Sequence, residues 1–399
     1  MSAESTVILV LNCGSSSIKY ALYPVQGDTV PRIAFWSGKI DGIGGGSSSY
    51  QESDQAPESI RLDPDAPYQD ALELIRTRVR QRLGERSVGA VVHRVVHGGA
   101  KYFQPVHIDA AVLKDLRSYI PLAPLHQPFA LEAIDALLES APGLPQFACF
   151  DTAFHHTLAR VEQIMPLPWE AWEKGLRRYG FHGLSYEYIA HALGERYGDQ
   201  AKGRVVVAHL GNGASICGMK NLQSAATTMG FSTLDGLMMG TRCGALDPGV
   251  ILHMMEVDKI PLERVARILT RESGLLGVSG ISSDTRELLA QEDTNERARV
   301  ALELYVRTII REVGAVAALL GGLDMLVFTA GVGQHNAEIR QRVCKGLGLF
   351  GAVLDADANA RNARVISARH SPLRVLVEPT NEEWIAATHA ARLLNAGGF

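Results

Sequence analysis

The stretch Val7-Ile8-Leu9-Val10-Leu11-Asn12-Cys13-Gly14-Ser15-Ser16-Ser17-Ile18-Lys19-Tyr20 lies near the start of the chain and has three parts. An apolar run is followed by a turn of Asn, Gly and three Ser, and then by a short segment that contains one Lys. This order is typical of a strand, a tight turn and a second strand. Backbone N–H groups, hydroxyls and one ammonium can together surround an anion. The turn is therefore either an ordinary polar hairpin or a phosphate-binding loop, and the rest of the chain must decide.

The composition limits the classes of protein to which the chain can belong. Its 399 residues predict two domains, and 46% hydrophobic with 21% charged residues is the balance of a globular protein. A formal net charge of −4 supplies no basic field, and no apolar segment is long enough to span a bilayer, so we expect no nucleic-acid or membrane partner. Val7 to Leu11 is too short for a signal peptide. The five scattered cysteines favour a reducing cytoplasm over a disulfide framework or a zinc site.

The hydrophobic pattern predicts an α/β chain. We expect strands near residues 6–12, 18–24, 32–38, 88–96, 146–151, 323–330 and 373–378, and helices near residues 67–83, 109–118, 127–139, 295–320, 336–347 and 382–394. The Gly/Ser-rich segment from Gly42 to Asp54 is expected to be an exposed connection. In the second half, Val205 to Ile216 repeats the opening order of apolar strand, small-residue turn and second strand. Internal duplication is the simplest explanation of that recurrence.

A third glycine-rich turn, Gly331-Val332-Gly333, separates a predicted strand from a predicted helix, and a helix N-terminus favours an anion. Three such turns on two similar halves predict a nucleotide held in a cleft between domains. The sequence contains no Gly-x4-Gly-Lys-Ser/Thr, no Gly-x-Gly-x-x-Gly after a strand and no Gly-x-Ser-x-Gly. A P-loop, a Rossmann dinucleotide site and an α/β-hydrolase are therefore disfavoured.

Several charged residues interrupt apolar strands or follow glycines, which is where sites form on α/β folds. Arg94 lies inside the apolar run Val91–Val96, where an unpaired charge is costly, so it faces either a structural ion pair or a bound anion. The same alternatives hold for Asp151 at the end of a strand, and His182 is either a packed histidine or a ligand-facing one. Further candidates lie in polar turns or at a helix start: Arg242, Asp284, Arg286 and Glu382. Embedded arginines without zinc-ligand spacing favour phosphoryl transfer, and a kinase over a hydrolase.

Seven blocks resemble the acetate/propionate kinase family of the actin, sugar-kinase and Hsp70-like superfamily. These blocks are Leu11–Lys19, His93–Gly99, Phe150–His155, Arg178–Gly183, His209–Gly213, Gly240–Arg242 and Thr380–Glu383, and the resemblance runs from Val7 to about Leu394. It implies an α/β fold of two similar domains of that superfamily type with an interdomain cleft. The N-terminal domain would span residues 1–150 and the C-terminal domain residues 151–384, with a helix at 385–399 packing back on the first. A homodimer is also implied.

The resemblance implies reversible transfer of the γ-phosphoryl group from ATP to acetate, directly and in line, with Mg²⁺ or alternatively Mn²⁺. It implies that Arg94, Asp151, His182 and Arg242 are catalytic and that Asn12 and Glu382 hold the metal. Arg94 would hold the acetate carboxylate, and the methyl group would lie among Val96, Leu125 and Phe181. The implied nucleotide-binding residues are Lys19, His209, Leu210, Gly211, Asn212, Gly213, Asp284, Thr285, Arg286, Gly331, Val332, Gly333, Gln334 and His335.

The chain departs from the family pattern at four places. Leu184-Ser185-Tyr186 stands where the family usually reads Thr-Ser-His, and Cys243-Gly244-Ala245 stands where it reads Ser-Gly-Asp. Gln334-His335 replaces Glu-Asn, and Thr233 replaces a common proline. The departures leave the nucleotide preference open, together with the choice between acetate and propionate. A propionate or short-chain acyl kinase and a non-catalytic nucleotide-binding regulator remain as alternatives.

Overall fold

The structure, a computed structural model, describes residues 6–53, 55–124 and 126–397, and these form two units. The first unit is built from the described residues up to Ala153 together with those from Asn381 onward, and the second unit is Phe154–Thr380. The sequence analysis placed the two boundaries after residues 150 and 384. The structure therefore groups Glu382 with the first unit, whereas a boundary after residue 384 would group it with the second.

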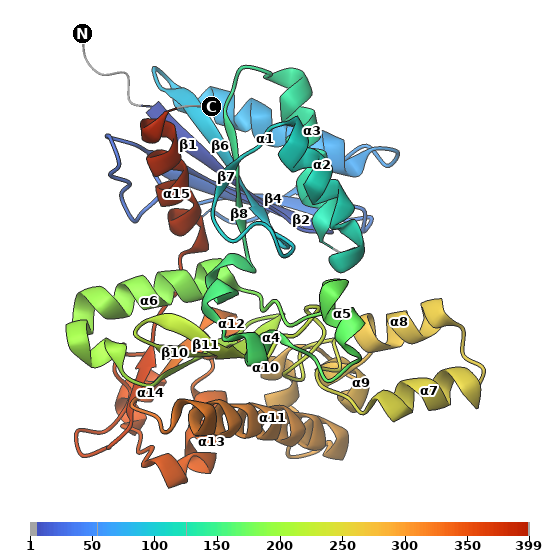
Figure 1. The fold of residues 1–399 in the computed structure, drawn as a ribbon, viewed down its shortest axis with the longest axis vertical. Helices are drawn as coiled ribbons and strands as arrows, with labels where there is room; N and C mark the ends of the chain where they lie inside the picture. The colour runs from blue at the N-terminus through green and yellow to red at the C-terminus, as the bar shows by residue number, and fades with distance from the viewer. Residues whose placement is uncertain (1–5, 54, 125, 398–399) are drawn as a thin grey trace. The chain divides into compact units, whose positions relative to one another are not determined.

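The first unit contains one mixed sheet with the strand order β5-β4-β3-β2-β1-β6-β8-β7 (Figure 1). Its strands are β1 (Thr6–Cys13), β2 (Ser17–Pro24), β3 (Trp36–Asp41), β4 (Ser48–Glu52), β5 (Glu58–Ile60), β6 (Ser87–Val95), β7 (Val106–His107) and β8 (Gln146–Phe150). Strand β1 is antiparallel to β2 and parallel to β6, and β6 is parallel to β8. The opening stretch of the sequence is thus the hairpin β1–β2, closed by a hydrogen bond of 2.8 Å from the Gly14 N–H to the Ser17 carbonyl.

Helices cover both faces of this sheet because β1 is apolar on both sides. The helices are α1 (Pro67–Leu83), α2 (Ala110–Ser118), α3 (Gln127–Ser140) and α15 (Glu382–Ala396), with a 3-10 turn at Ile120–Leu122. Leu9 and Leu11 pack with Ile75 and Val79 of α1 on one face. Helix α15 packs against β1 and β6 and buries small residues at that contact, namely Ala386, Ala387, Ala390 and Ala391. Small side chains allow the helix to approach the sheet closely. Along β1, Asn12 alternates with the residues that face α1, so its side chain lies on the α15 face.

The second unit contains a five-stranded sheet with the order β11-β10-β9-β12-β13. Its strands are β9 (Val205–Leu210), β10 (Ala214–Lys220), β11 (Gln223–Thr227), β12 (Met325–Thr329) and β13 (Arg374–Val377). Strand β9 is antiparallel to β10 and parallel to β12, and β12 is parallel to β13. The order and directions match those of β3-β2-β1-β6-β8 in the first unit. The predicted internal duplication is therefore confirmed in the strand topology.

The second unit's helices are α4 (Arg160–Gln163), α5 (Trp169–Glu173), α6 (Gly183–Tyr197), α7 (Pro248–Glu256), α8 (Leu262–Arg271), α9 (Gly274–Ser279), α10 (Thr285–Leu289), α11 (Glu296–Leu320), α12 (Ala330–His335), α13 (Ala337–Gly346) and α14 (Ala356–Ala360). Its 3-10 turns are Ala153–Thr157, which begins at the unit boundary, Gly198–Lys202 and Gly348–Phe350. Helix α11 approaches one face of the sheet so closely that a Cβ on Gly218 would lie 2.5 Å from Val316. Ser215 lies three residues before Gly218 on β10, so its side chain is on the other face of the sheet, where it contacts α6.

The structure corrects three sequence predictions. The segment from Gly42 to Asp54 is not wholly irregular, because it contains β4, whose Tyr50 is buried and bonds the Tyr20 hydroxyl at 2.7 Å; Asp54 itself lies outside the described residues. The strand predicted at 32–38 begins at Trp36 and continues to Asp41. The predicted turn Gly331–Gly333 is part of the short helix α12, which the chain enters through Ala330 at a φ of 64°.

Candidate active site

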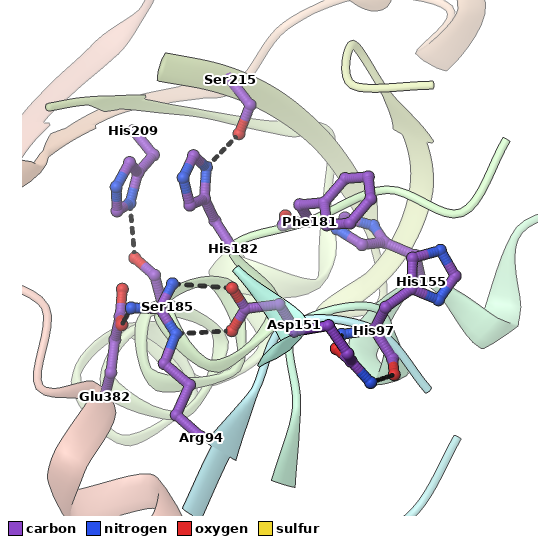
Figure 2. A network of polar contacts seen from close by, with 11 residues as sticks. Arg94, His97, Asp151, His155, Phe181, His182, Ser185, His209, Ser215 and Glu382 are labelled. Carbon is purple, nitrogen blue, oxygen red and sulfur yellow. Dashed lines mark hydrogen bonds and ion pairs between the residues drawn. The ribbon is translucent and has the colours of Figure 1, made fainter. Parts of the chain in front are cut away.

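In the first unit, Arg94 and Asp151 meet where two neighbouring parallel strands end. Arg94 is the penultimate residue of β6 and pairs in register with Cys149 of β8, so Asp151, two residues after Cys149, projects to the same side. The Arg94 Nε donates to Asp151 Oδ1 at 2.9 Å and its Nη2 donates to Oδ2 at 2.7 Å, as Figure 2 shows. This is the bidentate geometry in which a guanidinium holds a carboxylate most firmly.

Glu382, the first residue of α15, adds a second carboxylate to Arg94. Asn381 caps the helix by accepting from the Trp384 N–H at 3.0 Å, and this places Glu382 Oε2 at 3.1 Å from Arg94 Nη1. Burial raises the pKa of Glu382 to about 7, because Arg94 only partly offsets burial and Asp151 adds repulsion. Burial alone would lower the pKa of Arg94, but Asp151 and Glu382 outweigh it and raise that pKa. Two largely buried carboxylates therefore share one cation.

The opening hairpin brings Asn12 and Lys19 to the same face of the sheet. The two residues are directly paired across β1 and β2, so their side chains lie on one side. Asn12 is half-buried and Lys19 is exposed. Lys19 is near enough to Glu382 to lower its pKa, and it lines a cavity of about 320 Å³ together with Glu383. The first unit thus gathers five predicted site residues on the α15 face: Asn12, Lys19, Arg94, Asp151 and Glu382.

In the second unit, His182 is the N-cap residue of α6 and adopts a left-handed conformation, with a φ of 58°. Gly180 precedes it at a φ of 75°, and a Cβ there would lie 2.5 Å from the His155 ring, so only glycine fits. The His182 Nδ1 lies 2.8 Å from the Ser215 Oγ, and its ring stacks on His209 with centroids 4.1 Å apart. A second hydrogen bond of 2.8 Å joins the Ser185 Oγ to the His209 Nδ1, which Figure 2 also shows. The two rings are therefore fixed from both α6 and the sheet.

Arg242 converges on the outer nitrogen of His182. A Cβ on Gly213 would lie 3.3 Å from His182 Nε2 and 3.5 Å from Arg242 Nη1, so all three groups meet at one point. Arg242 Nη1 donates to the Thr233 carbonyl at 3.0 Å, and no carboxylate among the described residues lies within ion-pair distance of it. Burial lowers the pKa of Arg242. A largely buried cation without a carboxylate partner is suited to bind an anion.

A separate cavity of about 380 Å³ in the second unit collects most of the predicted nucleotide-binding residues. Those that line it are Gly211, Asn212, Asp284, Thr285, Arg286, Gly331, Val332 and His335, and the new lining residues include Gly240, Ser283 and Asn336. His209, Leu210, Gly213, Gly333 and Gln334 do not line it. Leu210 is buried in the sheet, and the carbonyls of Gly333 and Gln334 accept hydrogen bonds from Arg340. A larger cavity of about 1230 Å³, beside α1 and α3, is lined by none of the predicted site residues.

The residues predicted to line the methyl pocket belong to different units. Val96 is half-buried after β6 in the first unit, and Phe181 is buried in the second, where its carbonyl lies 2.9 Å from the His155 Nε2. Leu125 lies outside the described residues. Sequence reasoning missed Ser185, Ser215 and the buried Arg340. The spacing of His182, Ser185 and Tyr186 at i, i+3 and i+4 is the signal that could have shown one polar helix face.

Comparisons with known proteins identify the family. A sequence model of the Acetokinase family matches residues 7–388. An acetate kinase from Rhodopseudomonas palustris is 48% identical over 400 residues, which covers 98% of this chain and 100% of that relative. The chain belongs to the acetokinase family.

Solved structures of the acetokinase family share this fold. The acetate kinase of Porphyromonas gingivalis has a TM-score of 0.84 at 37% identity, covering 96% of this chain and 98% of that one. A propionate kinase from Francisella tularensis has a TM-score of 0.89 at 33% identity, with the same coverage of both chains. These matches, with the repeated sheet topology, confirm the α/β fold class of two similar domains.

Proposed function

We propose that this acetokinase-family chain transfers the γ-phosphoryl group of ATP to acetate, reversibly. A carboxylate oxygen forms the bond to the γ-phosphorus while the bond to the bridging oxygen of ADP breaks, giving acetyl phosphate and ADP. The observation that carries the proposal is end-to-end identity of 48% to an acetate kinase. The embedded arginines add physical support, since phosphoryl transfer depends on positioning and positive charge.

The residue roles follow from the charges around each group. Arg94 is the cation that holds the acetate carboxylate, and Asp151 fixes its guanidinium by the bidentate contact. Arg242 and His182 stabilise the phosphoryl group in transfer, because the buried guanidinium has no carboxylate partner among the described residues and the His182 Nε2 is directed to the same point. The 380 Å³ cavity takes the nucleotide, and Lys19 contacts its phosphates. Val96, Leu125 and Phe181 limit the size of the acyl group.

The donor groups in the first unit fit a magnesium ion. Within the described residues, no three His, Cys, Asp or Glu side chains gather to hold a metal by themselves. Mg²⁺ does not need such a group, because it keeps several waters and binds one or two protein oxygens together with substrate phosphates. Asn12 and Glu382 supply such oxygens, and repulsion from Asp151 makes a cation favourable beside Glu382. When bound, Mg²⁺ or Mn²⁺ neutralises charge on the phosphates.

A propionate or short-chain acyl kinase is the second candidate, favoured by the TM-score of 0.89 to a propionate kinase. Hydroxylamine trapping of acyl phosphate with Mg-ATP, with acetate, propionate and butyrate assayed separately, distinguishes the two. We expect the kcat/KM to be highest for acetate and to fall with each added methylene. A maximum at propionate or butyrate would favour the second candidate. Binding of ATP without product from any acid would favour a non-catalytic nucleotide-binding regulator.

The donor nucleotide is testable in the same assay. Of the two family departures at this turn, His335 lines the 380 Å³ cavity, whereas Gln334 does not. We expect ATP to be preferred over GTP and pyrophosphate. If the His335→Asn variant, which restores the family's usual residue, changes the ATP to GTP ratio while Gln334→Glu does not, the cavity is the base or ribose site. An equal effect of both variants would contradict that assignment.

We propose a cytoplasmic homodimer that binds neither nucleic acid nor membranes. None of the described helices combines the length and apolar character that a bilayer crossing requires. The five cysteines are free, which suits a reducing compartment. Exposed apolar side chains gather on α7 and α8, namely Val250, Leu252 and Leu262, and they support a dimer contact there. Light scattering of the chain and of its Leu252→Glu variant tests this, and a monomeric parent chain would contradict it.

A further inference from the structure

Three polar side chains at the N-terminal end of α6 contact one cross-strand pair of the second unit's sheet. His182 is the left-handed N-cap residue of this helix, and Ser185 and Tyr186 lie in its first turn. Ser215 of β10 and His209 of β9 are directly opposite each other, so their side chains lie on one side of the sheet. The contacts are crossed: His182 bonds Ser215, and Ser185 bonds His209.

Tyr186 completes the arrangement. Its hydroxyl lies 2.5 Å from the Ser215 Oγ, and both side chains are fully buried. The polar partner of the Tyr186 hydroxyl among the described residues is Ser215 alone, and Ser215 Oγ bonds only Tyr186 and His182 there. Burial raises the pKa of Tyr186 well above its ordinary value, so the phenol keeps its hydrogen. A buried O–H without an acceptor is costly, so that hydrogen must point to Ser215.

Counting donors and acceptors then fixes the proton on His182. Ser215 accepts from Tyr186, so its own hydrogen has one remaining acceptor, the His182 Nδ1. A nitrogen that accepts a hydrogen bond carries no hydrogen, so the neutral ring carries its hydrogen on Nε2. That nitrogen is the one directed toward the point shared by Gly213 and Arg242.

We propose that Tyr186 and Ser215 are positioning residues that hold His182 as the neutral Nε2–H tautomer, so that it donates a hydrogen bond to an oxygen of the transferring phosphoryl group. The destination of that hydrogen bond rests on the proposed function, whereas the tautomer does not. Tyr186 is one of the residues at which this chain departs from the family pattern, because histidine is usual at this position. A histidine there could donate or accept and would titrate, whereas a buried tyrosine is a fixed donor.

Arg242 also favours the neutral form of the His182 ring. Arg242 approaches its Nε2 side with a positive charge that disfavours an imidazolium. The His209 ring stacks at 4.1 Å and an angle of 15°, and its own Nδ1 is bonded by Ser185. Arg242 therefore favours the neutral His182 ring, and the bond from Ser185 holds the stacked His209 ring in place.

The tautomer is measurable without any turnover. In a long-range ¹H–¹⁵N spectrum of the intact protein at pH 7, we expect the His182 signals, assigned by their loss in His182→Gln, to show a protonated Nε2 and an unprotonated Nδ1. The Tyr186→Phe and Ser215→Ala variants should give a mixture of tautomers. Observation of His182 as the Nδ1–H tautomer or as the doubly protonated ring in the parent protein would overturn the proposal, whether or not the chain phosphorylates acetate.

Kinetics give the second readout. We expect Tyr186→Phe and Ser215→Ala each to lower kcat roughly 10- to 100-fold, the size of effect seen when a partner that orients a functional histidine is removed. KM for acetate and for ATP should change less than about twofold, and the double variant should lose no more than either single one. Tyr186→His, which restores the residue that is usual in the family, should recover kcat.

Tyr68→Phe is the matched control, because it removes a buried hydroxyl from α1, which packs on the sheet face opposite to that of Asn12. It should leave kcat unchanged. A kcat of Tyr186→Phe equal to that of the parent would contradict the positioning role.

Discussion

At the scale of single residues, the two proposed catalytic arginines have opposite electrostatic surroundings. Arg94 is held by Asp151 and Glu382, whereas Arg242 bonds a backbone carbonyl and has no carboxylate partner among the described residues. Removing one partner of a buried ion pair leaves an uncompensated charge, typically at a cost of about 3–5 kcal/mol. Removing a buried cation that has no counter-ion costs little. Loss of activity and loss of stability should therefore separate at these two positions.

We accordingly expect Arg94→Ala to lower both activity and the free energy of unfolding, the latter by about 3 kcal/mol. Arg242→Ala should lower kcat about 1000-fold, the loss seen when a transition-state charge partner is removed, with the melting temperature unchanged or raised. Urea denaturation and acyl-phosphate trapping on both variants measure the two quantities. Equal destabilisation of the two variants would show that Arg242 also has a structural partner.

His93, next to Arg94 in β6, should make the stability of the folded protein depend on pH. The side chain is buried, with its Nε2 at 2.7 Å from the Gln146 Oε1, and burial lowers its pKa to about 4. The unfolded state, with a pKa near 6.5, binds more protons between these values, so stability falls as the pH falls from 6.5 toward 4. At pH 5.5 this residue should cost about 1.4 kcal/mol relative to pH 8.

Urea denaturation of the parent and of His93→Asn at both pH values tests this expectation. The variant should be less stable at pH 8 but should lose less stability on acidification. Because other groups, including the buried His97, also titrate in this range, the difference between the two slopes is the quantity to compare. An identical slope in the two proteins would exclude His93 as a contributor.

At the scale of elements, α12 is fixed by a buried arginine on the next helix. Arg340 of α13 is fully buried, and its donors bond the Gly333 and Gln334 carbonyls at 2.9 and 2.7 Å. Its other donors bond Asn359 and Asn362 at 2.7 to 2.8 Å. The cation lies at the carbonyl end of α12, where a helix dipole favours positive charge. Arg340 therefore sets the position of the helix whose residues 331, 332 and 335 line the 380 Å³ cavity.

Replacing Arg340 by Lys keeps the charge but cannot reach all of these acceptors. We expect KM for ATP to rise about tenfold and the unfolding free energy to fall by about 2–3 kcal/mol, while KM for acetate stays the same. Steady-state kinetics and urea denaturation measure the three quantities. Lys345→Arg, a substitution at an exposed position on the same helix, is the matched control and should change none of them by as much.

The elements also show which features a sequence can reveal. Regular periodicity predicted the helix at Pro67–Leu83 correctly, because every fourth residue of that segment is apolar and buried. It could not reveal β4, whose Ser-Ser-Tyr-Gln-Glu sequence has one buried side chain and obtains its order from pairing with β3. Motif residues such as Arg94 and Asp151 interrupt apolar strands and were visible. Ser185, Ser215 and Arg340 were not, because their importance depends on contacts between distant segments.

At the scale of the whole molecule, the duplicated topology explains why the chain has two similar glycine turns with different contents. The hairpin β1–β2 carries Asn12 and Lys19 on its two strands, whereas the turn between β9 and β10 carries Gly211, Asn212 and Gly213. Equivalent strand pairs thus carry the residues proposed to bind metal and phosphate in the first unit and residues that line the 380 Å³ cavity in the second. One ancestral hairpin is consistent with both, because the strand order and directions are the same.

The same organisation makes α15 a part of the first unit. The helix follows the last strand of the second unit, yet it covers the β1 and β6 face of the first and carries Glu382. Ending the chain after Thr380 would expose the apolar Ile8 and Val10, which are buried on that face, and would remove one of the two carboxylates on Arg94.

We expect the truncated chain to be inactive and to lose amide protection in β1, β2 and β6, while β9, β12 and α11 stay protected. Hydrogen exchange resolved by peptide measures this directly. A matched variant of the full chain, Glu382→Gln, should lose activity but keep protection throughout, which separates the proposed metal-binding role of Glu382 from the structural role of its helix. Equal loss of protection in both units after truncation would show that the second unit also depends on α15.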